Sequence, residues 1–133
     1  ATADFLNNAD AYTKFSTDFK VDIYKRLSGL FDVFSRLKND GFRVSAIKPK
    51  AAIYLTVKFD LKGMKLPNGE ILNSTKDITQ FILNDAGVGL VPFNAFGAGN
   101  ESTWYRLSVG TCKIEDIEKV YQNLKQSLVK LKN

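Results

Sequence analysis

The stretch Gly87–Gly110 reads GVGLVPFNAFGAGNESTWYRLSVG and contains two short apolar runs separated by a loop rich in glycine and asparagine. The second run has the alternation of a β-strand, in which successive side chains point to opposite faces. One face carries Trp104, Arg106 and Ser108, and the other carries Tyr105, Leu107 and Val109. The sequence therefore predicts a guanidinium on a strand whose opposite face is apolar.

Arg106 has two interpretations at this point. A guanidinium is a planar fork of donors that matches a carboxylate or phosphate at two points, which makes Arg106 a candidate ligand contact. Alternatively, it is a solvent-facing arginine paired with a nearby Asp or Glu, as most surface charges are.

The composition limits the possible functions. The chain has 133 residues, 44% hydrophobic and 25% charged, which fits one globular domain with a real core. It contains no histidine, which removes Ser-His-Asp and Cys-His arrangements and histidine-based zinc sites. The single cysteine, Cys112, excludes an internal disulfide and fits a reducing compartment.

The charge pattern argues against two further classes. The formal net charge is +5, but the basic residues are scattered among acids rather than clustered as in a nucleic-acid-binding surface. No apolar run approaches the length of a membrane helix, and the start has no signal-peptide pattern. We therefore expect neither a nucleic acid nor a membrane as a partner.

The first 40 residues predict two helices. Large apolar residues recur at steps of three and four between Phe15 and Leu37, which indicates one helical face. Ser16-Thr17-Asp18 offers capping residues, so we expect a leading helix over Asp4–Phe15 and a longer one over Asp18–Lys38. Asn39-Asp40-Gly41 is a typical helix end.

The rest of the chain alternates between strands and helices. Ser74 and Asp77 form a near match to a capping box before a helix that ends at Gly87. Lys48-Pro49-Lys50 predicts a turn between the first two strands. The expected strands are Phe42–Ile47, Ala51–Asp60, Val88–Val91 and Thr103–Val109, and the last helix opens at Thr111 or Cys112. This order predicts an α+β domain with a small, mostly antiparallel sheet of three or four strands and helices on one face.

Three segments, in this order, resemble the C-terminal small domain of pyridoxal-phosphate-dependent aminotransferases of class I/II, fold type I. Lys48–Leu55 is similar to the family's proline turn and first small-domain strand. Leu83–Pro92, followed by Phe96-Gly97, resembles its helix, strand and proline loop. Tyr105–Ser108 resembles the arginine strand before the last helix.

The resemblance implies that Arg106 binds the α-carboxylate of an amino-acid or 2-oxo-acid substrate. It also implies a cytoplasmic, homodimeric parent enzyme that uses pyridoxal 5′-phosphate, held by a large domain absent from this chain. Residues 1–16 would then be a leading interdomain segment and 17–133 the small domain, inactive alone and with no cofactor bound. Ala51 and Phe93 stand where the family often has glycine.

Two other features suggest cofactor contacts only superficially. Lys76 follows two hydroxyl residues, as a Schiff-base lysine can, but it lies at a predicted helix start close before Arg106. The loop Gly97-Ala98-Gly99 leads into a strand and not into a helix, so it lacks the backbone cradle of a phosphate site.

Three alternatives stay open on the sequence. Lyases and synthases that use the same cofactor share this small domain. A ferredoxin-like module that binds a small anion without catalysis has similar layering. An RNA-binding sheet could use Tyr54 and Trp104 for stacking, although no characteristic motif is present.

Overall fold

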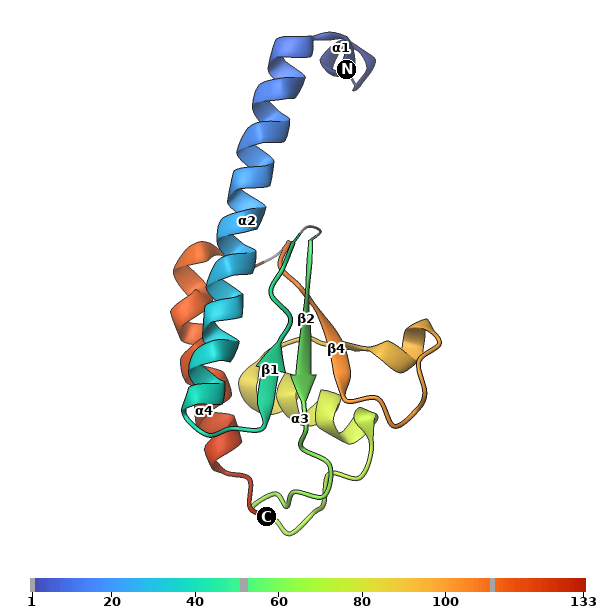
Figure 1. Cartoon of the computed structure of the whole chain (residues 1–133), viewed down its shortest axis with the longest axis vertical. Coiled ribbons are helices and arrows are strands. Elements are labelled where there is room, and N and C mark those ends of the chain that lie inside the picture. Colours follow the sequence, from blue (N-terminus) through green and yellow to red (C-terminus); the bar gives the residue numbers. More distant parts are fainter. Residues whose placement is uncertain (1, 51–52, 111) are drawn as a thin grey trace.

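The computed structural model describes residues 2–50, 53–110 and 112–133 as a four-stranded sheet with helices on one face (Figure 1). The strand order is β1-β2-β4-β3, and each neighbouring pair is antiparallel. The predicted α+β class and antiparallel sheet are therefore confirmed. The elements are α1 (Thr2–Asn7), α2 (Ala9–Asn39), β1 (Val44–Ala46), β2 (Tyr54–Phe59), α3 (Thr75–Ala86), β3 (Val91–Pro92), η1 (Phe93–Phe96), β4 (Trp104–Ser108), η2 (Ile114–Asp116) and α4 (Ile117–Val129).

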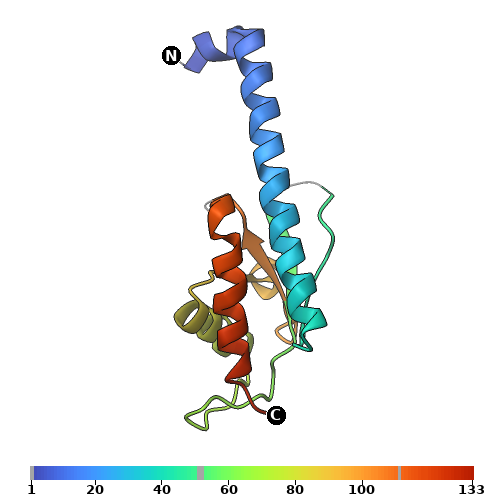
Figure 2. The same cartoon turned by 90° about the vertical axis from the view of Figure 1, so that its left-hand side faces the viewer.

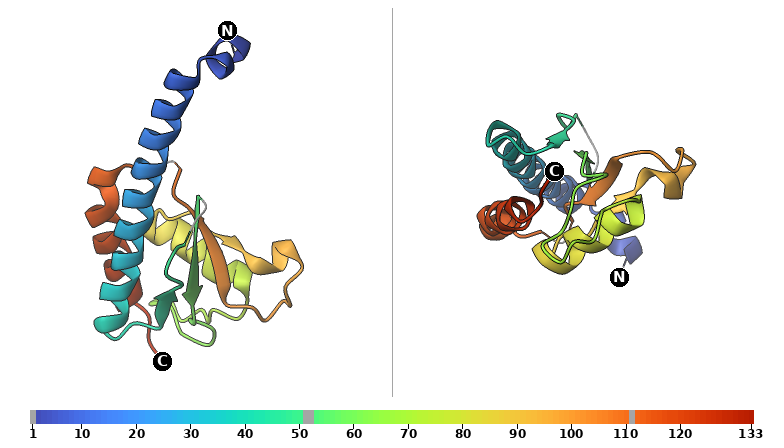
Figure 3. Two further views of the ribbon diagram at one scale, coloured as in Figure 1. Left: turned by 45° about the horizontal axis from the view of Figure 1, so that its top comes forward. Right: turned by 90° about the horizontal axis from the view of Figure 1, so that it is seen from below.

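The core lies between the sheet and the helices. β2 and β4 contribute fully buried side chains on their helix-facing side, and Phe59 packs edge-on against both Phe34 and Tyr105. α4 packs against both α2 and α3, which closes the helical layer (Figures 2 and 3). Burial of these large side chains is the main favourable contribution to folding.

The helix α2 extends well beyond the sheet. Its buried residues begin only at Ile23, and Figure 1 shows its first half projecting from the body of the domain. Phe15 and Phe19 stack with ring centroids 6.1 Å apart, although they are 58% and 49% exposed. The predicted apolar face therefore continues past the end of the core that this chain supplies.

The predicted break at Ser16-Thr17-Asp18 is wrong. The helix breaks at Asn8, whose side chain accepts a hydrogen bond from the Ala11 amide and so caps α2. The three capping-type residues lie inside α2, where the helical apolar pattern continues across them. The end of α2 is as predicted, with Gly41 at φ +94° two residues after Asn39.

The third strand and the start of the last helix also differ from the sequence expectations. The third strand is Val91–Pro92 rather than Val88–Val91, because only Val91 and Pro92 pair with β4. Cys112 precedes the last helix rather than opening it, since a 3₁₀ turn at Ile114 leads into α4. Thr111, Ala51 and Ala52, which some of those expectations include, lie outside the described residues.

The local start and stop signals around α3 are confirmed. Ser74 accepts from the Asp77 amide, and the Asp77 carboxylate accepts from the Ser74 amide, which completes the capping box. Hydrogen bonding with the Ser74 side chain is the main cause that lowers the pKa of Asp77. Gly87 ends the helix at φ +69°, a left-handed conformation that glycine adopts without steric penalty.

Candidate functional site

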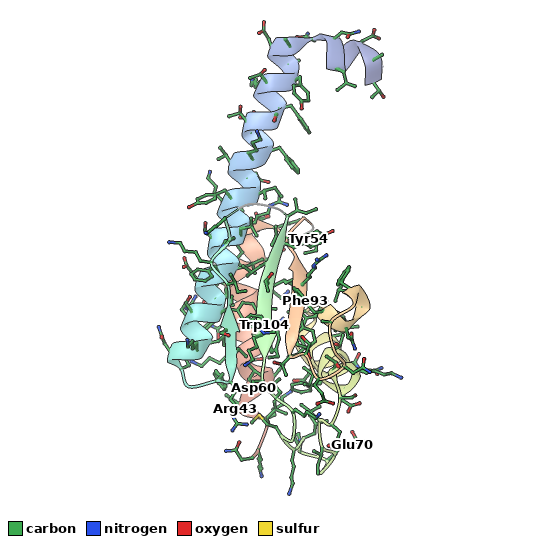
Figure 4. All side chains as sticks on the ribbon, turned by 45° about the vertical axis from the view of Figure 1, so that its right-hand side comes forward. Arg43, Tyr54, Asp60, Glu70, Phe93 and Trp104 are labelled. Carbon is green, nitrogen blue, oxygen red and sulfur yellow. The ribbon has the colours of Figure 1, made fainter. Side chains whose placement is uncertain are left out.

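The sheet face opposite the helices carries Arg106. In the register, Arg106 pairs with Thr56 on β2 and with Val91 on β3. Its neighbours Tyr105 and Leu107 point the other way and are buried in the core. The predicted alternation of β4 is therefore confirmed, and it leaves the guanidinium on the open side of the sheet. Figure 4 labels Tyr54 and Trp104, which lie on this side as well.

A short 3₁₀ turn brings aromatic rings to Arg106. β3 pairs with β4 beside the arginine, and η1 follows directly after Pro92. The turn ends at Gly97, which has φ +89°. The Arg106 guanidinium carbon is 3.9 Å from the Phe96 ring centroid, 5.4 Å from that of Phe93 and 5.9 Å from that of Tyr54. Distances within about 6 Å are those of cation–π contacts.

The side chain of Arg106 has no acid partner among the residues that the structure describes. Within the described ranges, its guanidinium takes part in no ion pair and no hydrogen bond. Arg106 is half-buried, so the group is partly shielded from water and still open on one side. The interpretation of Arg106 as an arginine paired with this domain's own carboxylate is therefore wrong.

The ion pairs of the domain lie elsewhere. Arg36 binds Glu118 across α2 and α4, and Lys130 binds Asp85 between α4 and α3. The hydrogen bond from Arg36 lowers the pKa of Glu118 to about 2. The hydrogen bond from Lys130 similarly lowers the pKa of Asp85. These two contacts join helices and lie away from the open sheet face.

Lys76 and the loop Gly97–Gly99, which resemble cofactor contacts only superficially, lie where the sequence predicted. Lys76 is exposed in the first turn of α3. The loop at Gly97–Gly99 leads toward β4 and not into a helix. In the described part of the chain, no group of three or more acidic or cysteine side chains is arranged to hold a metal ion. Among the helices described, none has the length and apolar character needed to cross a lipid bilayer.

The sequence predicted the strand face on which Arg106 lies, but not the contacts of Arg106 with Phe93 and Phe96. Their spacing of three residues was the available signal, because one turn of 3₁₀ helix places such residues on the same side. The sequence gives no measure of how far the turn folds back over β4. Their rings lie edge to face, with centroids 6.5 Å apart.

An apolar groove lies at the base of the projecting half of α2. It has a volume of about 390 Å³ and is formed by one side of α2 and the segment around Pro49. Phe19, Tyr24 and Ile53 contribute much of its apolar lining and are each at least 40% exposed. A patch of this kind is typical of a surface that another polypeptide covers.

Known proteins with similar sequences are aminotransferases. In sequence, the chain is 35% identical over 72 residues to a probable aspartate/prephenate aminotransferase of Rickettsia bellii. It is 33% identical over 82 residues to the corresponding protein of Rickettsia conorii. These matches cover 53% and 61% of the chain. No protein-family model matches the chain.

Solved structures agree with the sequence comparison. The aspartate aminotransferase of Rhizobium meliloti superposes with a TM-score of 0.74 at 20% identity and covers 96% of the chain. The aromatic aminotransferase of Pyrococcus horikoshii gives 0.70 at 23% identity, also over 96%. The chain is therefore homologous to part of the aminotransferases and has the fold of a segment of them, which confirms the resemblance.

The chain is much shorter than these proteins. It spans 17% and 20% of the length of the two Rickettsia relatives. It covers 29% and 30% of the two solved structures. Most of each relative therefore has no counterpart among these 133 residues.

Proposed function

We propose that this chain is the small domain of a pyridoxal-phosphate-dependent aminotransferase and that Arg106 binds the α-carboxylate of its amino-acid or 2-oxo-acid substrate. The observation that carries the proposal is the half-buried guanidinium on the open sheet face, with no acid partner among the described residues. A guanidinium so placed can bind a planar carboxylate at two points, which fixes both the position and the orientation of the substrate.

The chain's own part in the reaction is binding and orientation. Arg106 has the fork geometry and the permanent charge for this task, and the rings beside it exclude water from one side of the guanidinium. Movement of the small domain toward the substrate would bring Arg106 onto the carboxylate and close the site to water.

The residues described here do not fit pyridoxal 5′-phosphate. Lys76 is exposed at the start of α3, and Gly97–Gly99 offers no helix N-terminus to a phosphate. The cofactor would be held by the large domain, which would also supply the proton transfers of the reaction. The 133 residues alone would be inactive.

The large domain is the partner that the surface favours. The exposed rings on the first half of α2 and the apolar groove beside Tyr24 are suited to burial against a second domain. Most of the sequence of each relative has no counterpart in this chain and is long enough to form such a domain. Residues 1–16 would be a segment leading into the small domain of residues 17–133. A homodimeric, cytoplasmic parent completes the proposal.

The names of the relatives favour an aminotransferase over a lyase or a synthase with the same cofactor. Both Rickettsia proteins are named as probable aspartate/prephenate aminotransferases. Transfer of an amino group between an amino acid and a 2-oxo acid is therefore the activity to assay first in the longer enzyme.

Kinetics of the longer enzyme that contains this chain would test the role of Arg106. Arg106→Ala is expected to lower kcat/KM for amino acids. The corresponding activation free energy should rise by about 2–4 kcal/mol, the cost of leaving one member of a buried charge pair unpaired. Arg106→Lys keeps the charge but loses the fork and is expected to recover only part of the activity. Lys58→Ala is the control, because Lys58 is a second cation on the same sheet face. Unchanged kinetics in Arg106→Ala would exclude the proposed role.

A further inference from the structure

Phe96 contacts Arg106 without occupying its hydrogen-bond donors. The guanidinium carbon lies over the Phe96 ring at 3.9 Å from the centroid, the shortest of its three aromatic contacts. An aromatic ring attracts a cation through its electron-rich face. An acid partner would hold the same guanidinium through its N–H groups. Contact with a ring therefore restrains the arginine while its N–H groups stay available.

The chain holds Phe96 in place through the turn η1. The Ala98 amide donates to the Phe93 carbonyl at 3.2 Å, and the Gly97 amide donates to the Asn94 carbonyl at the same distance. The edge-to-face contact between Phe93 and Phe96 also supports the ring. Phe96 is nevertheless 53% exposed, so its burial in the core of this domain does not explain its position.

Arg106 needs such a restraint because its side chain is long. An unrestrained arginine loses side-chain rotamer entropy when it is fixed on a ligand. β-Sheet pairing fixes only the backbone at Arg106, through its neighbours Thr56 and Val91. A ring beside the guanidinium lowers this loss before the ligand arrives, which strengthens binding without a further contact to the ligand.

We infer that Phe96 is a positioning residue, whose ring holds the Arg106 guanidinium with its N–H groups directed to a carboxylate; the inference rests on the function proposed above. Phe93 and Tyr54 contribute less, because their centroids lie farther from the guanidinium carbon. Phe96 itself makes no hydrogen bond to the substrate.

The first test uses the 133-residue chain and the Arg106 Nε–Hε signal in nuclear magnetic resonance. Phe96→Leu removes the ring and is expected to move this signal toward that of a free arginine and to lower its order parameter. Phe31→Leu is the matched control, because Phe31 packs against the core from α2. An unchanged Arg106 signal in Phe96→Leu would overturn the inference whatever the enzyme does.

The second test measures kinetics in the longer enzyme. Phe96→Leu is expected to raise KM for amino acids about 5- to 10-fold with kcat changed less than about twofold, as lost preorganisation of a binding group would. Phe96→Tyr keeps the aromatic face and is expected to restore KM, whereas a purely structural role would not distinguish Leu from Tyr in this way. Phe31→Leu is expected to leave KM unchanged.

The two proposals fail in different ways. If Arg106→Ala impairs the enzyme and Phe96→Leu leaves KM at the wild-type value, the inference about Phe96 is wrong and the proposed function stands. If Arg106→Ala leaves the kinetics unchanged, the proposed function is wrong, and the positioning role toward a substrate is wrong with it.

Discussion

Arg36 on α2 and Glu118 on α4 form a two-point ion pair, with Nη1–Oε2 at 2.6 Å and Nη2–Oε1 at 3.0 Å. The Arg36 guanidinium also lies over the Tyr121 ring, 3.6 Å from its centroid. The hydrogen bonds from Arg36 lower the pKa of Glu118 from an ordinary value of 4.5 to about 2. The pair therefore connects the two helices in a pH-dependent way.

Glu118→Gln is expected to lower the thermal unfolding temperature slightly at neutral pH and not at all in strong acid. A depressed pKa stabilises the folded state above the unfolded pKa, near 4.5, and this contribution disappears as the pH falls through about 2. Melting curves of both proteins between pH 2 and 7 measure the difference. Because both side chains are exposed, the effect is small. A difference that persists unchanged to the acid limit would contradict the assignment.

Tyr105→Phe is expected to leave stability unchanged or raise it by up to about 1–2 kcal/mol. The Tyr105 hydroxyl is buried and has no hydrogen-bond partner among the residues described, and burial raises its pKa to about 12. A buried hydroxyl without a partner is destabilising, so its removal relieves that cost. Denaturant unfolding measures the change.

Tyr121→Phe is the matched comparison for Tyr105→Phe. The Tyr121 hydroxyl donates to Asp40 at 2.6 Å and accepts from Lys125 at 3.2 Å. Its loss is expected to destabilise the domain by about 1–2 kcal/mol, since a charged partner loses its hydrogen bond. Equal effects of the two Tyr-to-Phe changes would show that hydrogen bonding does not decide the difference.

Gly29→Ala is expected to raise the free energy of unfolding by less than the usual gain for replacing glycine inside a helix. Alanine in a helix interior is favoured over glycine by about 1 kcal/mol. A Cβ at Gly29 would lie only 2.7 Å from Cδ1 of Ile117, so that side chain has to move. Ile117→Val removes Cδ1, and in that background Gly29→Ala is expected to give the full gain. A double-mutant cycle by chemical denaturation measures this coupling, and additive changes would refute it.

Arg106→Ala is expected to change the stability of the 133-residue chain by less than about 1 kcal/mol. The guanidinium lacks an acid partner in the described ranges and contacts mainly exposed or half-buried rings, for which cation–π energies of about 0.5–1 kcal/mol apply. Calorimetric melting measures the difference. A loss of several kcal/mol would indicate that Arg106 serves the fold rather than a ligand.

The sequence predicted those features that depend on local chemistry. The capping box at Ser74 and Asp77 and the glycine end at Gly87 need only neighbouring residues, and both occur as expected. The alternation that separates Arg106 from Tyr105 also follows from the period of a strand. These signals predicted the fold class and the sheet face on which Arg106 lies.

Features that depend on competition or on distant contacts were not predictable in this way. Asn8 and the residues Ser16–Asp18 are all of types that can cap a helix. Capping preference alone therefore did not predict that α2 begins after Asn8. The approach of Phe96 to Arg106 depends on how η1 folds over a strand that comes later in the chain. Sequence spacing carries no such information.

The unbroken course of α2 from its exposed half into the core has a mechanical consequence. A 31-residue helix is about 46 Å long and contains no proline that would let it bend sharply. A partner bound to the first turns of α2 would therefore move the sheet together with the helix. A rotation of α2 by a few degrees about one end shifts the other end by a few ångströms. Under the proposed function, a contact at the first turns of α2 would therefore also move Arg106 relative to the substrate.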